Sequence, residues 1–363
     1  MPSSARFMLA CIAAFWLIVP IGLNAGKPVL IKKPNPTHVE KDSMYIPLEK
    51  VAGIDEEIDD ENFFARPMDL VTDDRGGFFV FDHILEKIFS FGKDLKLRKV
   101  FLNLGNGPFE IMKKEPVIQR LYFSHDGHLY VISSFNKKIM SFTREATPIK
   151  EIRLPQYHVP QFTPVVDKAG NIYTYSPRND GIDVLDKNLK IKYTLLNNGE
   201  MDKYLIKAPP DNPYPPKGYA LNFVTLMYDV LPDGRLLVYV ARSSILYIFK
   251  EGKLQKQYKI WPERTIPNLL LRIEKFKKRF KNEYIEVNLF NSFFVDKDNE
   301  SFFYLTTSAK TDEQKLIYRF TLDGRLDNIY YFPFKSIRRI LAKRNQLFYG
   351  VGESDISIFK IKK

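Results

Sequence analysis

Short apolar segments alternate with polar turns along most of the chain, and one arrangement of them recurs. In each copy, an apolar strand leads into a turn centred on Asp-Gly or a similar pair, and a second strand follows. After a short gap, a third strand ends in Ile-x-x-Phe or a close variant. The turns with their second strands are DRGGFFVFD, HDGHLYVIS, KAGNIYTYS, PDGRLLVYV, KDNESFFYL and KRNQLFYGV; the third strands end in IFSF, IMSF, IDVL, LYIF, IYRF and ISIF. Such recurrence predicts a repeat architecture.

The spacing inside the copies is nearly constant. The turn residue and the last residue of the third strand are 15 positions apart in the pairs Gly76–Phe91, Gly127–Phe142, Gly170–Leu185 and Gly234–Phe249. The separation is 21 for Asn299–Phe320 and 14 for Asn345–Phe359. The extra residues of the fifth copy fall in its gap, near 308–314, where a surface loop can absorb them. The copies continue through a polar turn into a fourth strand, such as 95–102 or 253–260.

These units predict an all-β fold, a six-bladed β-propeller of four-stranded antiparallel blades. The sixth copy stops directly after its third strand, whereas residues 44–51 (MYIPLEKV) precede the first copy and belong to no repeat. We therefore expect this N-terminal strand to complete the sixth blade and close the ring, leaving no open edge there. A β-sandwich with many hairpins would not explain a repeated unit.

The first repeat carries a family resemblance. The segment GIDEEIDDENFFARPMDLVTDDRGGFFVFDHILEKIFSF and the following NLGNGPFEI resemble the six-bladed propellers related to NHL repeats found among secreted bacterial proteins. The likeness covers roughly residues 40–363, and its motifs define blades and turns rather than a catalytic site. The chain departs from the family pattern at Phe109, Asn299 and Asn345, where glycine is usual.

The N-terminus has the pattern of a secretory signal peptide. Arg6 is the only charge before Lys27, and an apolar run at 7–23 ends in small residues that allow cleavage after Ala25. We therefore expect a signal peptide at 1–25, a tail at 26–43 and one propeller at 44–363, in a secreted or periplasmic protein. Two alternatives are an uncleaved membrane anchor and a lipidated Cys11.

Composition narrows the classes of protein. The 363 residues are 45% hydrophobic and 14% aromatic, which is too apolar for a disordered chain. A single cysteine excludes disulfide frameworks and Cys-ligated metal sites. The 55 Lys and Arg exceed the 43 Asp and Glu, and the net charge of +12 suggests an anionic partner.

Two long insertions connect blades at about 195–224 and 261–287. Both should lie on the face that carries the blade-to-blade connections and the gaps between second and third strands, which we call the decorated face. The second insertion predicts an amphipathic helix after Pro267, whose apolar stripe consists of Leu269, Ile273, Phe276 and Phe280. Its other side carries Arg272, Lys275, Lys277, Lys278, Arg279 and Lys281. This side is either a solvated surface or a binding surface for an acidic polysaccharide, an anionic lipid headgroup or a phosphorylated partner.

One polar residue precedes or begins each predicted inner strand, which should line the central channel. These residues are Arg66, Gln119, Gln161, Thr225, Asn291 and Ser336, and Arg338 and Arg339 add positive charge. Such a ring could bind a ligand at the channel mouth or simply hydrate the channel.

The sequence contains few residues that could form a catalytic site. The five histidines are His38, His83, His125, His128 and His158, of which only His83 and His158 could reach the decorated face. No metal site or cofactor is predicted, because a channel metal needs a cluster of His, Asp and Glu. The acidic run at 55–61 lacks EF-hand spacing and predicts a solvated loop.

The sequence thus favours an exported, monomeric propeller that binds a protein or an anionic glycan through its decorated face. Contact with a membrane surface is compatible with its charge, whereas nucleic acid is not expected, since no motif for reading it is present. Two other classes stay open: a metal-dependent lyase or hydrolase with its site in the channel, and a structural subunit of an envelope assembly.

Overall fold

The computed structural model describes residues 37–105, 107–111, 119–133, 137–154, 164–176, 181–196, 226–240, 244–263, 290–307, 315–332 and 337–362. Within these ranges the chain is all β apart from one short 3-10 helix, η1 (Asp42–Met44). The predicted signal peptide, the predicted amphipathic helix and most of both insertions lie outside these ranges. The described part of the chain contains no helix long and apolar enough to cross a membrane.

Four sheets each consist of four antiparallel strands that follow one another in sequence. The first contains β2 (Pro67–Thr72), β3 (Phe78–Asp82), β4 (Lys87–Phe91) and β5 (Leu97–Phe101). The second contains β8 (Gln119–Phe123), β9 (Leu129–Ser133), β10 (Lys138–Phe142) and β11 (Pro148–Arg153). The third contains β12 (Val165–Val166), β13 (Ile172–Ser176), β14 (Gly181–Leu185) and β15 (Ile191–Leu195). The fourth contains β16 (Leu226–Val230), β17 (Leu236–Val240), β18 (Ile245–Lys250) and β19 (Lys253–Lys259).

A further sheet has eight strands in the order β20-β21-β22-β23-β1-β26-β25-β24. One half consists of β20 (Phe290–Val295), β21 (Phe302–Thr307), β22 (Lys315–Thr321) and β23 (Leu326–Phe332). The other half consists of β24 (Arg339–Arg344), β25 (Leu347–Val351) and β26 (Ile356–Ile361). The N-terminal strand β1 (Tyr45–Ile54) lies between them, and the short pair β6 (Asn103–Leu104) and β7 (Glu110–Ile111) stands apart.

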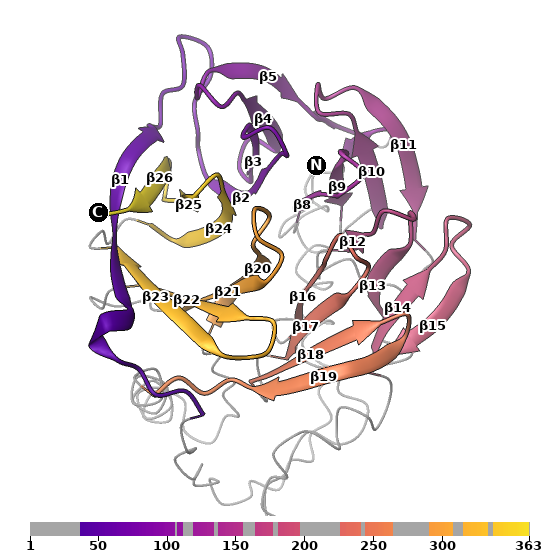
Figure 1. The fold of residues 1–363 in the computed structure, drawn as a ribbon. Helices are drawn as coiled ribbons and strands as arrows, with labels where there is room; N and C mark the ends of the chain where they lie inside the picture. Colours follow the sequence, from indigo (N-terminus) through magenta and orange to yellow (C-terminus); the bar gives the residue numbers. More distant parts are fainter. Residues whose placement is uncertain are drawn as a thin grey trace, which may run out of the picture.

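The sheets are arranged around a central axis as in a β-propeller (Figure 1). The first strands β2, β8, β12, β16, β20 and β24 lie nearest the axis, and neighbours among them contact each other, as β2 does with β8 and β24. Each inner strand begins at the decorated face and ends at the turn to its second strand. We call the face that carries these turns the hairpin face.

An aspartate holds the turn that follows an inner strand. The carboxylate oxygen Oδ1 of Asp73 accepts hydrogen bonds from the backbone N–H groups of Arg75 (2.8 Å) and Gly77 (2.7 Å). Between them, Gly76 has a φ of 88°, which a residue without Cβ adopts at little cost. Asp167 holds the corresponding turn of the third sheet in the same way. The recurring Asp-x-x-Gly pattern is therefore a turn device.

Two departures from the family pattern keep the backbone conformation that glycine favours. Phe109 has a φ of 55° and Asn345 a φ of 50°. The N–H of Phe109 donates to Oε2 of Glu151 at 2.9 Å, and its ring meets that of Phe142 at 5.7 Å. These contacts offset the strain of a bulky residue in the left-handed region.

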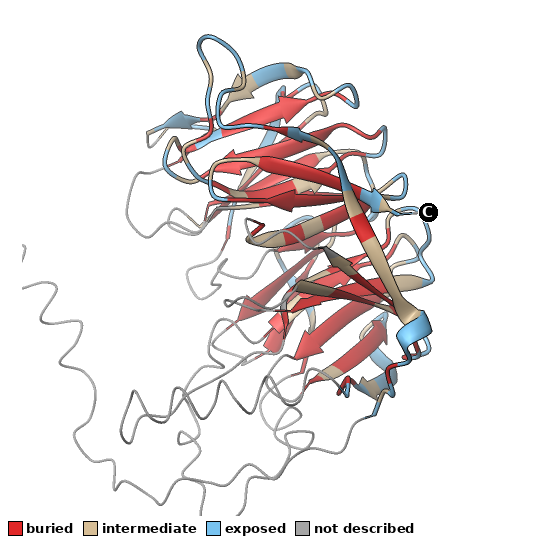
Figure 2. Ribbon diagram, turned by 90° about the vertical axis from the view of Figure 1, so that its left-hand side faces the viewer, coloured by how far each residue is buried: buried red, intermediate tan, exposed pale blue. Residues whose placement is uncertain are grey.

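The core lies between the sheets. The second strands β3, β9, β13 and β17 are buried along their whole length, whereas the outer strands β5, β11, β15 and β19 are largely exposed (Figure 2). Aromatic rings pack from one sheet to the next, as Phe79 does on Phe123 at 6.1 Å between ring centroids. The high aromatic content is thus used to join neighbouring sheets.

The N-terminal strand closes the ring. Residues 48–54 of β1 pair antiparallel with β26, which confirms the predicted completion of the last repeat. Residues 45–47 also pair in parallel with β23, a contact that the sequence did not predict. One strand therefore hydrogen-bonds the last two repeats together.

Truncating Leu48 tests this closure. Its side chain is 2% exposed and lies in a cluster with Ile340, Phe348 and Phe359. We expect Leu48→Ala to lower the free energy of unfolding by about 2–5 kcal/mol, as for other buried leucines. Val51 lies on the same strand but is 42% exposed, so Val51→Ala should change it by less than about 0.5 kcal/mol. Equal effects in denaturant titrations would contradict a role for β1 packing in stability.

Candidate functional site

The structure places only part of the predicted polar ring. Arg66 precedes β2, and the Oδ2 atom of buried Asp82 accepts its backbone N–H at 2.6 Å. Arg338 precedes β24 and pairs with the exposed carboxylate of Glu353 at 3.1 Å. Gln119 and Asn291 lie on β8 and β20, but their side chains are outside the described part of the structure, as are the residues Gln161, Thr225 and Ser336. The helix cations Arg272, Lys275, Lys277, Lys278, Arg279 and Lys281 also lie outside the described residues.

Instead, a cluster of charged residues occupies the decorated-face end of the axis. Asp69, Arg120 and Arg339 come from the inner strands β2, β8 and β24. Arg338 and Lys315 adjoin them. We call these five residues the arginine cluster.

Asp69 joins two inner strands. Its carboxylate is 7% exposed, and it accepts the N–H of Leu70 at 3.1 Å and that of Leu121 on β8 at 2.8 Å. Asp229 on β16 repeats the arrangement, accepting the N–H of Val230 at 2.9 Å and that of Val295 on β20 at 3.4 Å. Both oxygens of each carboxylate thus serve the backbone, so the carboxylates fix the spacing of neighbouring sheets.

The guanidinium groups of Arg120 and Arg339 flank Asp69. Burial raises the pKa of the Asp69 carboxyl, and the positive charges of Arg120 and Arg339 oppose this rise. Burial lowers the pKa of Arg339, and the like charge of Arg120 lowers it further. Neither arginine forms an ion pair with any residue that the structure describes, and the buried Nε of Arg120 makes no hydrogen bond. Positive charge is therefore in excess here.

Lys315 adds a titratable cation. Its ammonium donates to the carbonyl oxygens of Ile337 and Arg338, the latter at 2.6 Å. Burial, followed by the charges of Arg339 and Arg338, lowers the pKa of Lys315 to about 8. The cluster therefore loses positive charge in mildly alkaline solution.

The hairpin-face end of the axis is different. The ammonium of Lys297, which follows β20, lies 5.4 Å from the ring centre of Tyr122 on β8 and 3.8 Å from the carboxylate of Asp229. His125 Nε2 bonds the carbonyl of Val230 at 3.0 Å. Burial raises the pKa of Tyr122 well above its usual range, while burial and then the charge of Lys297 lower the pKa of His125. Side chains from separate sheets thus meet across the axis, with opposite charges in contact.

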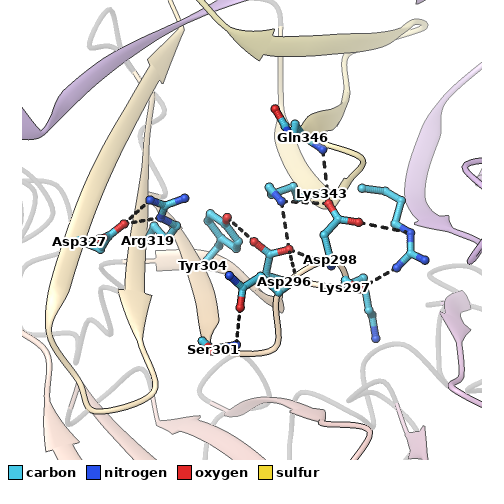
Figure 3. Close-up of polar contacts among 11 residues, drawn as sticks. Asp296, Lys297, Asp298, Ser301, Tyr304, Arg319, Asp327, Lys343 and Gln346 are labelled. Atoms are coloured by element: carbon cyan, nitrogen blue, oxygen red, sulfur yellow. Dashed lines mark hydrogen bonds and ion pairs between the residues drawn. The ribbon is translucent and has the colours of Figure 1, made fainter.

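A buried ion-pair network lies beside this end (Figure 3). The ammonium of Lys343 on β24 is 3.0 Å from Oδ1 of Asp296 and 3.0 Å from Oδ2 of Asp298, and Tyr304 donates to Asp296 at 2.8 Å. Arg344 donates to the carbonyl of Lys297 at 2.8 Å. Its opposite charges are balanced and in contact, although the buried Nε of Arg344 makes no hydrogen bond. This network clamps the two halves of the eight-stranded sheet.

The candidate catalytic residues do not come together. The described residues include no group of three or more His, Cys, Asp or Glu that could hold a metal ion. The ring of His38 bonds the carbonyl of Gly324 at 2.8 Å, and the N–H of His83 donates to the carbonyl of Arg66 at 2.9 Å. His158 lies outside the described residues. In the acidic run, Asp59 accepts backbone N–H groups within its own loop.

The sequence reasoning missed Asp69 and Arg120. Each is a charged residue inside an otherwise apolar inner strand, in PMDLVT and QRLYF. A charge at such a position needs a partner or a ligand, and that signal could have identified both.

Removing Lys343 tests the clamp. We expect Lys343→Ala to lower the free energy of unfolding by about 3–5 kcal/mol, because it leaves buried Asp296 without its cation. Lys360→Ala is the matched control, since Lys360 pairs with Glu49 at 3.1 Å on the surface. That loss should be about 0–1 kcal/mol. If the two variants lost similar amounts of unfolding free energy in denaturant titrations, burial would not determine how much the Lys343 ion pairs contribute to stability.

The lowered pKa of Lys315 predicts a pH effect on stability. Between about 8 and its usual value of 10.5, the unfolded chain retains a proton that the folded chain has released. The free energy of unfolding should therefore gain a contribution from Lys315 that grows as pH rises through this window. Lys315→Met should lose that slope, whereas Lys256→Met on exposed β19 should retain it. Equal slopes in the wild type and Lys315→Met would contradict the prediction.

Comparisons with known proteins identify the fold. The structure is similar to an exported protein from Bacteroides fragilis, with a TM-score of 0.58 and 11% identity over 88% of this chain and 99% of that chain. It is also similar to a catalytically inactive virginiamycin B lyase from Staphylococcus aureus with quinupristin, with a TM-score of 0.51 and 14% identity over 87% and 99%.

A member of the DUF4221 family from Bacteroides vulgatus has a TM-score of 0.50 and 12% identity over 87% of this chain and 98% of that chain. No protein-family model matches the sequence, and no curated protein matches it. At these identities the likeness concerns the fold alone, and together with the sheet arrangement it establishes a β-propeller architecture.

Proposed function

We propose that this chain is an exported β-propeller module that binds a protein or an anionic glycan at its decorated face and is not itself an enzyme. The arginine cluster carries this proposal. It gathers half-buried positive charge at the axis end where the inner strands begin, and Asp69, its one acid, already accepts backbone hydrogen bonds with both oxygens.

We count six blades in this module. The eight-stranded sheet comprises two blades if β1 supplies the fourth strand of the blade that contains β24, β25 and β26. With the four separate sheets this makes six, and the repeat spacing of the sequence supports the same number. A relationship to NHL-type propellers is part of this proposal.

The proposal includes export by a signal peptide at 1–25, followed by a tail at 26–43, to the periplasm or the outside of the cell. The apolar run and small residues of the N-terminus support it. So does the likeness in fold to an exported protein. The cationic side of the helix predicted after Pro267 would extend the positive potential of the decorated face.

A metal-dependent lyase or hydrolase is the second candidate. The likeness in fold to virginiamycin B lyase favours it. It would require a group of metal ligands in the channel, and the described residues supply no such group. We prefer binding because the arginine cluster supplies positive charge that no described acidic side chain contacts.

Charge reversal at two matched arginines tests where binding occurs. Arg338 lies at the decorated face and pairs with Glu353, while Arg235 follows the hairpin-face turn after β16 and pairs with Asp233 at 2.6 Å. Arg338→Glu and Arg235→Glu change the net charge equally. On immobilised polygalacturonate, an anionic polysaccharide, we expect Arg338→Glu to elute at markedly lower salt than the wild type, and Arg235→Glu to elute close to it.

Equal shifts in the two variants would mean that retention follows net charge rather than the decorated face. A larger shift for Arg235→Glu would place binding at the hairpin face. Either result, or a wild type that is not retained, would contradict glycan binding at the decorated face.

A further inference from the structure

We propose that the arginine cluster is a binding site for one carboxylate group, held between the guanidinium groups of Arg120 and Arg339. This inference rests on the proposed function, because it names the chemistry of the ligand that the decorated face would take. Arg120 was not predicted, whereas Arg339 was named beside Arg338 as positive charge added to the predicted ring.

The topology brings the two arginines to one place. The strands β24, β2 and β8 are consecutive around the axis, and β2 contacts the other two (Figure 1). The hydrogen bond from the N–H of Leu121 to Asp69 fixes the backbone next to Arg120 against β2 at 2.8 Å. Arg339 begins β24 on the other side of β2. The guanidinium groups therefore approach Asp69 from opposite neighbours.

The protein does not neutralise these charges itself. Asp69 lies between the arginines but gives both oxygens to backbone N–H groups, and no oxygen of an acidic side chain among the described residues lies within 4.0 Å of a nitrogen of Arg120 or Arg339. A guanidinium cannot shed its proton, and leaving its buried donors unpaired is costly. The buried Nε of Arg120 is one such donor. An anion from outside the chain would remove this cost.

Above a pH of about 8 the charges favour a monoanion. Lys315 has then released its proton and Arg338 has Glu353 as its partner, so two guanidinium groups and the Asp69 carboxylate leave a single positive charge. A carboxylate matches that charge, and its two oxygens suit the paired N–H donors of a guanidinium. Phosphate in this pH range is a dianion and would bring more negative charge than the site lacks.

We expect a ligand to approach the site from the decorated face. At the hairpin face, Lys297 and Tyr122 meet across the axis, and His125 bonds the carbonyl of Val230. A ligand therefore presents its carboxylate end first, as a terminal acidic sugar or a peptide C-terminus can.

Binding of small probes to the full mature chain tests the proposal. The probes are D-galacturonate for a sugar acid, N-acetylglycine for a peptide end, inorganic phosphate, and neutral D-galactose, all at about pH 9, where Lys315 is neutral, and at constant ionic strength. We expect at least one carboxylate probe to raise the melting temperature and to bind in calorimetry, with D-galactose inactive. The carboxylate that binds more tightly identifies the source of the ligand.

Arg120→Gln and Arg339→Gln should each weaken that binding by about tenfold to a hundredfold, the range for losing one charge-assisted contact. Arg235→Gln, at the hairpin face, is the control and should bind as the wild type does. Without ligand, each variant loses one repulsion between like charges and one attraction to Asp69, so its own melting temperature is the reference for the shift that a probe causes. A merely structural arginine would change that reference temperature but leave the affinity for the probe unchanged.

Three results would overturn the proposal: no response to either carboxylate, binding of phosphate in preference to both, or an unchanged affinity in the two cluster variants. The proposed function fails separately. If the Arg120→Gln, Arg339→Gln double variant is still retained on polygalacturonate, binding at the decorated face stands and the carboxylate site is wrong. If the probes bind but the wild type is not retained on polygalacturonate, the carboxylate site stands and glycan binding at the decorated face is wrong.

Discussion

The backbone hydrogen bonds of β1 are the interaction on which the rest of the structure depends. They join β23 on one side and β26 on the other, so that the last two repeats become one sheet. A propeller whose ends do not meet would leave its first and last sheets with open edges and with apolar faces in water. Closure also brings β24 against β2. The proximity of Arg339 to Asp69, which are far apart in sequence, is a direct result of closing the ring.

Charged side chains are paired differently at the two ends of the axis. At the hairpin face, Lys343 lies between Asp296 and Asp298, and each charge has a partner in contact. At the decorated face, Arg120 and Arg339 share only Asp69, whose oxygens serve the backbone. A buried charge that is satisfied adds rigidity, whereas one that lacks a partner costs stability unless something binds it. Among the described residues, the excess of positive charge lies at the decorated-face end of the axis, where we propose that a ligand binds.

Much of the fold could be predicted from the sequence, because a turn with aspartate and glycine, followed by an apolar strand, recurs along the chain with nearly constant internal spacing. The closing strand was predictable because it fitted no repeat, but its parallel pairing with β23 has no sequence signature. The site was harder to predict. On β8 the polar ring was placed at Gln119, one residue from Arg120, whereas Arg339 was named as added positive charge beside Arg338. Because consecutive side chains of a strand point to opposite faces, a predicted site residue on a strand has to be right to the exact position.

The place of β1 in the sheet also sets an order of events. The antiparallel partner of β1 is β26, at residues 356–361. β1 is synthesised early, but it cannot form this pairing until nearly all of the described chain has been synthesised. Contacts between such distant segments form slowly, because the loop between them must first be closed. In the interval, the edges of β1 and β26 are both available to other chains. Folding of this protein therefore cannot be completed until the C-terminal strand β26 is present. A defect in β26 would leave the N-terminal strand β1 without its antiparallel partner.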